Sequence, residues 1–459
     1  MYDAFDDDEP APTPWAFEIL VALFVALALV AGGGSASAAS AGIVRLAAIP
    51  VLAIALWRAS TWPPARAWLW PVLVLAGACV LILIQLVPLP PEVWRALPGR
   101  GILADGYAAA GMALPALPIS MAPHATLDAA LGLLPPAAAF LAVLGLDTAA
   151  RRRLALVVVV MALVSIGLGM LQIAGGERSP LRFYAFTNLD SAVGFFANRN
   201  HQASFLVAAI PLAAAVAASL SRRAANAGFM SILAVSVVVV LIVGVAVTRS
   251  RAGVVLLIPA SLGALAITMR SRRRRDGLAG LWPVLALGGA ILAAGALVAV
   301  FSYTPLAKRF ASVEETRPRI ARAVLDAGFD YAPFGSGAGS FEPVYRIHEA
   351  PERLLPVFIN HAHNEYAEIW LEASWPGLAL AAAFVAWWVA SVVGVLRDWT
   401  TSGRGMQLAG ATIVAIYLLH SLADYPLRAA GAMVVFALAC GLMVSSTWLS
   451  EAEGGEEPD

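Results

Sequence analysis

Charged side chains are scarce in this sequence, and their scarcity excludes an ordinary soluble domain. Asp, Glu, Lys and Arg make up 13% of the 459 residues, whereas 60% are hydrophobic. Soluble globular domains carry about 25% charged residues. No basic surface interleaved with aromatic side chains stands out either, so nucleic acid is not an expected partner.

Cysteine and the common catalytic loops are also missing. The two cysteines, Cys79 and Cys440, both fall within apolar runs, which indicates buried apolar side chains rather than a disulfide. The sequence contains no His-Glu-x-x-His motif for zinc. The Gly335–Gly339 run lacks the Lys-Ser/Thr pair of a nucleotide-binding loop, and its expected role is a close backbone approach or a flexible turn.

Long apolar runs are abundant, and each is long enough to cross a bilayer at about 17–25 residues. In lipid every backbone donor and acceptor must be paired internally, so each run predicts a helix. We therefore expect an all-α integral membrane protein with a large extracytoplasmic loop carrying short helices. About twelve transmembrane helices are predicted, near residues 16–33, 42–57, 68–87, 127–146, 154–174, 202–220, 229–248, 252–269, 281–303, 376–396, 406–423 and 430–449.

The first apolar run follows an acidic segment, which argues against a cleaved signal peptide. Residues 1–14 contain five acidic residues and no basic one, whereas a signal peptide begins with positive charge. The predicted organisation is an acidic cytoplasmic N-terminus at 1–15, transmembrane helices 1–5 at 16–174, transmembrane helices 6–9 at 175–303, a large periplasmic loop at 304–375, transmembrane helices 10–12 at 376–449 and an acidic tail at 450–459.

Short arginine-rich loops predict the orientation of the chain, because such loops stay on the cytoplasmic side. With twelve spans and both termini cytoplasmic, five of these loops fall on the same face. They contain Arg58 and Arg66, Arg151–Arg153, Arg222 and Arg223, Arg270 with Arg272–Arg275, and Arg397 with Arg404.

The same orientation places the polar segment 304–375 on the outer side of the membrane. All six histidines fall on that side, namely His124, His201, His348, His361, His363 and His420. A histidine titrates near neutral pH and can move a proton. We therefore expect a working surface on the outer face.

The predicted outer segments are unusually rich in arginine. A guanidinium grips phosphate with a planar fork, so an anionic, phosphate-bearing ligand is expected there. Solvated loop charge and snorkelling side chains are the alternative, which we favour for Lys308, Arg309 and Arg353. Arg249 and Arg251 differ, because their turn joins two apolar spans, where a charge is costly.

Several segments between about residues 190 and 430 resemble the O-antigen ligase and polymerase superfamily. Their motifs are Phe196-Ala197-Asn198-Arg199-Asn200-His201, Ser250-Arg251-Ala252-Gly253, the glycine-rich stretch Phe334–Phe341, His361-Ala362-His363-Asn364-Glu365-Tyr366 and the segment His420–Arg428. One departure is visible. The family often has leucine four positions after its histidine, and Ala367 stands there, which weakens assignment to the ligase branch.

The resemblance implies a glycosyltransferase of surface polysaccharide or lipopolysaccharide biosynthesis in a bacterial inner membrane. Such proteins transfer a glycan from a polyprenyl (undecaprenyl) diphosphate carrier to an acceptor hydroxyl, with inversion and without metal or other cofactor. The acceptor is a lipid A-core, a growing polysaccharide or a protein. By resemblance His363 is the base that takes the acceptor proton, and Arg251 contacts the diphosphate.

Other residues are candidates for the same site. Arg249, Arg319 and Arg346 are candidate diphosphate contacts by position, and Arg428 either binds substrate or forms an ion pair with Asp424. Another set either lines the substrate cleft or caps a span, namely Asn198, Asn200 and His201. Supporting roles are expected for His361, Asn364 and Glu365.

Two alternatives stay open for the histidine segment and two for the whole protein. His361 and Glu365 have the spacing of one helical turn, and with Glu368 and Glu372 they could hold a metal or simply cap a span. Within the superfamily, an O-antigen or exopolysaccharide polymerase and a protein O-oligosaccharyltransferase are alternatives to a ligase. A polysaccharide or lipid transporter is the alternative from another class.

Overall fold

The computed structural model describes residues 13–34, 38–62, 66–221, 227–272, 284–293, 295, 316–349, 359–398 and 404–445. Within these ranges the regular elements are helices, apart from an isolated bridge between Leu89 and Leu117. The prediction of an all-α protein is confirmed. Several expected charges lie outside the described residues, among them Arg222, Arg223, Arg273–Arg275, Lys308, Arg309 and Arg353, as do the acidic segments 1–12 and 450–459.

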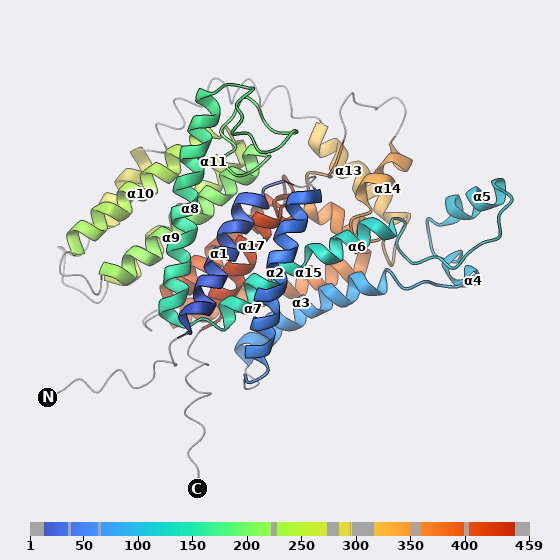
Figure 1. The fold of residues 1–459 in the computed structure, drawn as a ribbon, viewed down its shortest axis with the longest axis horizontal. Coiled ribbons are helices and arrows are strands. Elements are labelled where there is room, and N and C mark those ends of the chain that lie inside the picture. The colour runs from blue at the N-terminus through green and yellow to red at the C-terminus, as the bar shows by residue number, and fades with distance from the viewer. Residues whose placement is uncertain are drawn as a thin grey trace, which may run out of the picture.

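The helices follow one another along the chain, and a long connection, residues 175–198, joins α8 to α9 (Figure 1). The N-terminal part contains α1 (Trp15–Ala31), α2 (Ala38–Ala59), α3 (Arg66–Ile84), α4 (Pro91–Trp94), α5 (Gly101–Ala109), α6 (Pro123–Gly132), α7 (Leu134–Leu144) and α8 (Thr148–Ala174). The rest contains α9 (Arg199–Ser221), α10 (Ala227–Val247), α11 (Arg251–Arg272), α13 (Thr316–Phe329), α14 (Phe341–His348), α15 (Glu365–Arg397), α16 (Arg404–His420), the 3-10 helix η3 (Pro426–Arg428) and α17 (Ala430–Met443).

Eight of the described helical segments are long and apolar enough to cross a membrane, counting α6 and α7 as one. Three further apolar helices are shorter, namely Trp15–Ala31, Val284–Ala293 and Ala430–Met443. The chain is therefore a multi-pass membrane protein. The expected number of twelve spans stays a prediction.

The core of the bundle is built around α9, whose residues are buried over most of its length. α9 packs against α8, α10, α11 and α16, while α17 packs against α1, α7 and α16. α3 and α15 pack together, and few residues in their apolar stretches are buried within the protein. Such open apolar surfaces suit contact with lipid.

Several helix ends meet at one end of this bundle. α9 begins there at Arg199, α11 at Arg251 and α15 at Glu365, while α16 ends there at His420. α15 is interrupted two residues after Glu372, where Ser374 has a φ of +45° and Pro376 follows. The first part of α15 thus caps the bundle, and a helix start carries partial positive charge that favours anions.

Two helices of the polar segment, α13 and α14, pack onto this cap. Ile320 and Val324 of α13 and Phe341 and Val344 of α14 share a small apolar cluster with Leu371 of α15. The cluster is separate from the core of the bundle. It fixes α13 close to the helix ends where the polar residues gather.

Candidate functional site

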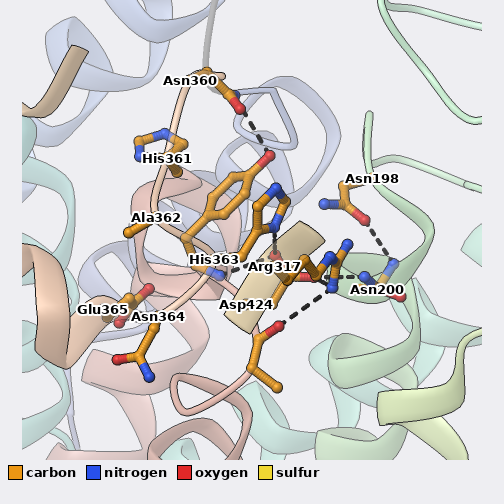
Figure 2. A network of polar contacts seen from close by, with 12 residues as sticks. Asn198, Asn200, Arg317, Asn360, His361, Ala362, His363, Asn364, Glu365 and Asp424 are labelled. Atoms are coloured by element: carbon orange, nitrogen blue, oxygen red, sulfur yellow. Dashed lines mark hydrogen bonds and ion pairs between the residues drawn. The ribbon is translucent and has the colours of Figure 1, made fainter. Parts of the chain in front are cut away.

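A buried carboxylate, Asp424, connects the segments that meet at this end of the bundle. Its Oδ1 lies 3.1 Å from Nδ1 of His363, and its Oδ2 accepts a hydrogen bond from the side-chain amide of Asn200. The guanidinium of Arg317 on α13 lies 3.5 Å from Oδ2 and donates to the carbonyl of Ala423 at 3.2 Å. Figure 2 shows His363, Asn200 and Arg317 converging on this one side chain.

The polar network continues from Asn200 into the turn between α10 and α11. The hydroxyl of Ser250 donates to Oδ1 of Asn200 at 2.8 Å and accepts from the backbone N–H of Gly253 at 3.0 Å. Ser250 therefore caps α11 and links its first residue, Arg251, to the network. Asn198 accepts from the backbone N–H of Asn200 at 2.8 Å, which caps the start of α9.

The backbone holds His363 in an uncommon conformation. Its φ is +52°, a region that is costly for residues with a side chain and that persists where the surroundings enforce it. The next residue, Asn364, caps α15 by accepting from the N–H of Ala367 at 3.0 Å, and its amide donates to the carbonyl of Leu422 at 3.1 Å. These bonds fix His363 beside Asp424.

The charge of Asp424 determines which nitrogen of His363 carries hydrogen. Burial raises the pKa of Asp424, but the hydrogen bond from His363 and the positive charge of Arg317 outweigh it, so the pKa lies well below its usual range. An ionised carboxylate only accepts hydrogen bonds, and we therefore assign the hydrogen to Nδ1. Nε2 of the neutral ring then keeps its lone pair, and the His363 side chain is 21% exposed.

Tyr425 packs among the other histidines of the site. The centre of its ring lies 4.1 Å from that of His361 and 5.1 Å from those of His363 and His201. The ring centre of His420, which is also buried, lies 6.5 Å from that of His201. Within the described part of the chain, Nε2 of His201 and both ring nitrogens of His420 are buried without a hydrogen-bond partner.

Carboxylates on one face of α15 form the other side of the network. Arg428 of η3 lies 3.0 Å from Glu368 and 2.9 Å from Glu372. Glu368 also lies 3.2 Å from Nδ1 of His361 and accepts from the backbone N–H of Ala362 at 2.7 Å. Burial lowers the pKa of Arg428, but the neighbouring carboxylates outweigh it and raise that pKa above its ordinary value.

Glu365, the first residue of α15, binds the turn that carries Asp424. It accepts from the hydroxyl of Ser421 at 2.8 Å and from the backbone N–H of Leu427 at 2.6 Å. Its own backbone N–H donates to the carbonyl of Ser421 at 3.0 Å. The start of α15 and the 421–428 turn are therefore joined by hydrogen bonds on both sides of Asp424.

The remaining predicted arginines differ in their surroundings. Arg249 has a φ of +55°, and its side chain is 57% exposed and 4.0 Å from Asp190. Arg319 is exposed on α13, two residues after Arg317. Arg346 is also exposed and pairs with Glu342 of its own helix at 3.0 Å, so the structure does not bring Arg346 to Asp424.

The glycine-rich stretch is a packing junction between α15 and the segment before α6. Gly335, Gly337 and Gly339 have φ values of +83°, +108° and +76°, which favour glycine. The backbone N–H of Gly337 donates to the carbonyl of Glu372 at 2.9 Å, and a Cβ added at Gly337 would meet Ser120. The close backbone approach expected here is thus made to the protein itself.

Two details differ from the sequence expectations. The ion pair considered between Arg428 and Asp424 is replaced by pairs of Arg428 with Glu368 and Glu372, because η3 turns Arg428 toward α15. The helical spacing considered for His361 and Glu365 does not apply, because α15 begins only at Glu365. His361 faces Glu368 instead, at 3.2 Å.

Several residues that join the site together are not predicted from the sequence. The sequence predicts Asp424 only as a partner of Arg428, and Glu368 only as a metal ligand or as a cap of a span. Ser250, Arg317 and Tyr425 had no assigned role. The sequence does contain a signal for Asp424, because it is a carboxylate next to an apolar span. A carboxylate is costly to bury unless a positive charge or hydrogen bonds compensate it, so a partner for Asp424 could have been expected.

The fold and site define a helical, multi-pass membrane protein with a histidine–carboxylate pair where several helix ends converge. Residues 236–382 match the sequence model of the O-antigen ligase family, Wzy_C. This part of the chain is therefore similar to the O-antigen ligase family, which confirms the resemblance seen in the motifs. Asn200 and Asp424 lie outside the matched range. No curated protein matches the chain.

Proposed function

We propose that the protein transfers a glycan from an undecaprenyl diphosphate carrier to an acceptor hydroxyl, with His363 as the base. The observation that supports this role most directly is the 3.1 Å contact between Nδ1 of His363 and the buried Asp424. A base must be held in one tautomer with its free nitrogen toward the reacting proton. The family match supports glycosyl transfer of the ligase or polymerase type in polysaccharide biosynthesis.

The proposed reaction is a direct displacement at the anomeric carbon. The acceptor oxygen forms a bond to that carbon while the bond to the diphosphate oxygen breaks, so the configuration inverts. Nε2 of His363 takes the hydroxyl proton, and Asp424 stabilises the imidazolium that results. The diphosphate leaves with its negative charge, so no metal or other cofactor is required as an acid.

Several arginines lie near His363 and Asp424, which we call the dyad. Their positive charge complements the negative charge of the leaving diphosphate. Arg251 begins α11 next to Ser250, and Arg317 combines its contact to Asp424 with a side chain that is 34% exposed. The helix starts at Arg199, Arg251 and Glu365 add partial positive charge at the same end of the bundle. Arg249 and Arg319 are proposed as outer contacts of the glycan or diphosphate.

The membrane arrangement is part of the proposal. We place twelve spans in a bacterial inner membrane, both termini in the cytoplasm and the site on the periplasmic face, with segment 304–375 as a periplasmic loop. The arginine-rich loops support this orientation. Alkaline phosphatase fusions after residues 150, 198, 249 and 424 test it, with high activity expected for the last three only.

A gene deletion followed by gel analysis of surface glycans tests the function in cells. Loss of long chains from lipopolysaccharide, free polysaccharide or glycoprotein identifies the acceptor as lipid A-core, a growing polysaccharide or a protein. A plasmid with the natural gene is expected to restore the chains, and His363→Ala is not, at equal protein level. Full restoration by His363→Ala would remove His363 as the base.

A transporter of polysaccharide or lipid is the alternative, and purified protein separates it from a transferase. In detergent no membrane divides two compartments, so a transporter alone makes no product. We expect the detergent-solubilised protein to consume the lipid-linked glycan that the deletion strain accumulates. Absence of any transfer, together with movement of that glycan across vesicle membranes, would favour transport.

A further inference from the structure

We propose that Glu368 is a positioning residue that sets the distance between His363 and Asp424; this rests on the proposed function of the dyad. The Glu368 side chain is 0% exposed and lies on α15. It contacts neither ring nitrogen of His363 nor the carboxylate of Asp424. Its contacts reach the two segments that carry them.

The first contact of Glu368 fixes the segment before His363. Oε1 accepts from the backbone N–H of Ala362 at 2.7 Å, and Oε2 lies 3.2 Å from Nδ1 of His361. Ala362 directly precedes His363, whose φ of +52° has to be enforced by its neighbours. A bond to the preceding N–H restrains the peptide plane from which that conformation starts.

The second contact of Glu368 fixes the segment after Asp424. Oε2 lies 3.0 Å from the guanidinium of Arg428, which ends η3 four residues beyond Asp424. Glu365 holds the same turn through the N–H of Leu427 at 2.6 Å. The carboxylate of Glu368 thus contacts both the segment that contains His363 and the turn that contains Asp424.

The cost of this arrangement argues for a purpose beyond packing. Three carboxylates, Glu365, Glu368 and Glu372, are buried on one face of α15, and Arg428 is the arginine paired with two of them. Buried ion pairs contribute little to stability compared with apolar packing, and they are well suited to specifying one geometry. A catalytic pair benefits from one fixed geometry, since a displacement of about 1 Å lowers the rate on the order of 100-fold.

Glu372 provides a matched control within the same structure. It lies one turn further along α15, is buried, and pairs with Arg428 at 2.9 Å. Its other oxygen accepts from the N–H of Phe341 at the start of α14, at 3.2 Å. Glu372 therefore shares the charge and the arginine with Glu368 but has no contact with segment 360–363 among its described hydrogen bonds.

The experiment compares Glu368→Gln with Glu372→Gln in purified full-length protein. The donor is the undecaprenyl diphosphate-linked glycan that accumulates in the deletion strain, and the acceptor extract of that strain is in excess. In Glu368→Gln the NH₂ group of the amide must face either the N–H of Ala362 or the guanidinium of Arg428 and Nδ1 of His361. For Glu368→Gln we expect kcat to fall about 10–100-fold and KM to stay within about 3-fold of the natural protein. For Glu372→Gln we expect kcat to fall less than about 3-fold.

Three further measurements separate positioning from a purely structural role. Histidine ¹⁵N spectra of Glu368→Gln, with His363 assigned from His363→Gln, are expected to show mixed tautomers at His363. The double variant Glu368→Gln with Asp424→Asn is expected to have a kcat less than about 2-fold below that of Asp424→Asn alone, because both substitutions act through the dyad. If Glu368→Gln does not fold, Glu368→Asp keeps the charge but draws it back from Ala362, and kcat should still fall.

The outcomes distinguish this inference from the proposed function. Equal losses in Glu368→Gln and Glu372→Gln, or an unchanged His363 spectrum, would overturn the positioning role while His363→Gln still abolishes transfer. Full transfer in His363→Gln would instead overturn the proposed function. A fully additive loss in the Glu368→Gln and Asp424→Asn double variant would also contradict the positioning role.

Discussion

The site has two sides that differ in burial and in the state of their charges. We call the side formed by Glu365, Glu368 and Asp424 the carboxylate wall; these side chains are buried and each accepts hydrogen bonds from the protein. We call the side formed by Arg249, Arg317 and Arg319 the arginine rim. Arg249 and Arg317 have 57% and 34% of their side chains exposed.

This difference indicates that the two sides have different roles. A buried carboxylate whose lone pairs are engaged cannot serve a ligand without breaking bonds, and so the carboxylate wall sets geometry. An exposed guanidinium keeps donors available, and so the arginine rim can meet phosphate oxygens. His363 turns Nδ1 toward the wall, 3.1 Å from Asp424.

The largest expected effect comes from breaking the carboxylate wall at Asp424. Asp424→Asn removes the charge that stabilises an imidazolium at His363 and permits the other tautomer. We expect transfer to fall about 10²–10⁴-fold, the range typical of a lost general base. Glycan transfer by the purified variant measures this loss.

The matched control is Asp190→Asn, which changes an exposed carboxylate beside Arg249 and Arg199. Its transfer rate is expected to stay within about 3-fold, because surface ion pairs contribute little. Equal losses in the two variants would contradict the division into wall and rim.

The arginine rim and Arg251 are tested by replacing the fork with a point charge. Arg251→Lys and Arg317→Lys keep the charge but lose paired donors to phosphate, and each is expected to cost about 10–100-fold in transfer. Arg346→Lys serves as control, since Arg346 pairs with Glu342 on an exposed helix face. Activity of Arg251→Lys and Arg317→Lys equal to that of Arg346→Lys would show that neither grips the diphosphate.

A smaller effect is expected at the hydroxyl that links the two sides. Ser250→Ala removes the hydrogen bond to Asn200 and the cap of α11, at a cost of about 1 kcal/mol in unfolding free energy. Transfer should fall about 2–5-fold, as a neutral hydrogen bond is worth about 1 kcal/mol. Ser391→Ala, whose hydroxyl bonds only its own helix at Trp387, should leave transfer unchanged. A transfer rate that is lower in Ser391→Ala than in Ser250→Ala would contradict a role of the Ser250–Asn200 hydrogen bond in transfer.

The smallest effect concerns stability at acidic pH. The pKa of Asp424 is lower in the folded protein than in the unfolded chain, where it is about 4, so its ionised form stabilises the fold. That contribution is complete above about pH 5 and is lost as the pH falls through the folded pKa. The difference in Tm between the natural protein and Asp424→Asn should therefore shrink from pH 6 to pH 3. A difference that stays constant over that range would contradict the low pKa.

The sequence predicted the helical membrane fold and much of the site, because these depend on local patterns. Apolar runs report spans directly, and the motifs around Asn200, Arg251 and His363 fall on helix starts that meet in the structure. Asn198 as a cap and Asn364 as a support also follow from residue type and position.

The contacts that the sequence did not predict are those that depend on the tertiary structure. Asp424 and Arg428 are four positions apart, yet η3 turns them toward different partners, His363 and Glu368. Arg317 and Arg319 look equivalent in sequence, but the helical rotation between them gives only Arg317 a contact with Asp424 among the described residues. Spacing along the chain does not determine these directions.

The central claim is that His363 removes the proton of the acceptor hydroxyl while Asp424 holds its ring. Single-turnover transfer from the undecaprenyl diphosphate-linked glycan, measured with purified natural protein and His363→Gln at saturating donor, tests it most directly. The account predicts that His363→Gln binds donor with a Kd within about 3-fold and transfers at least about 100-fold more slowly. A single-turnover rate within about 3-fold of the natural protein would contradict it.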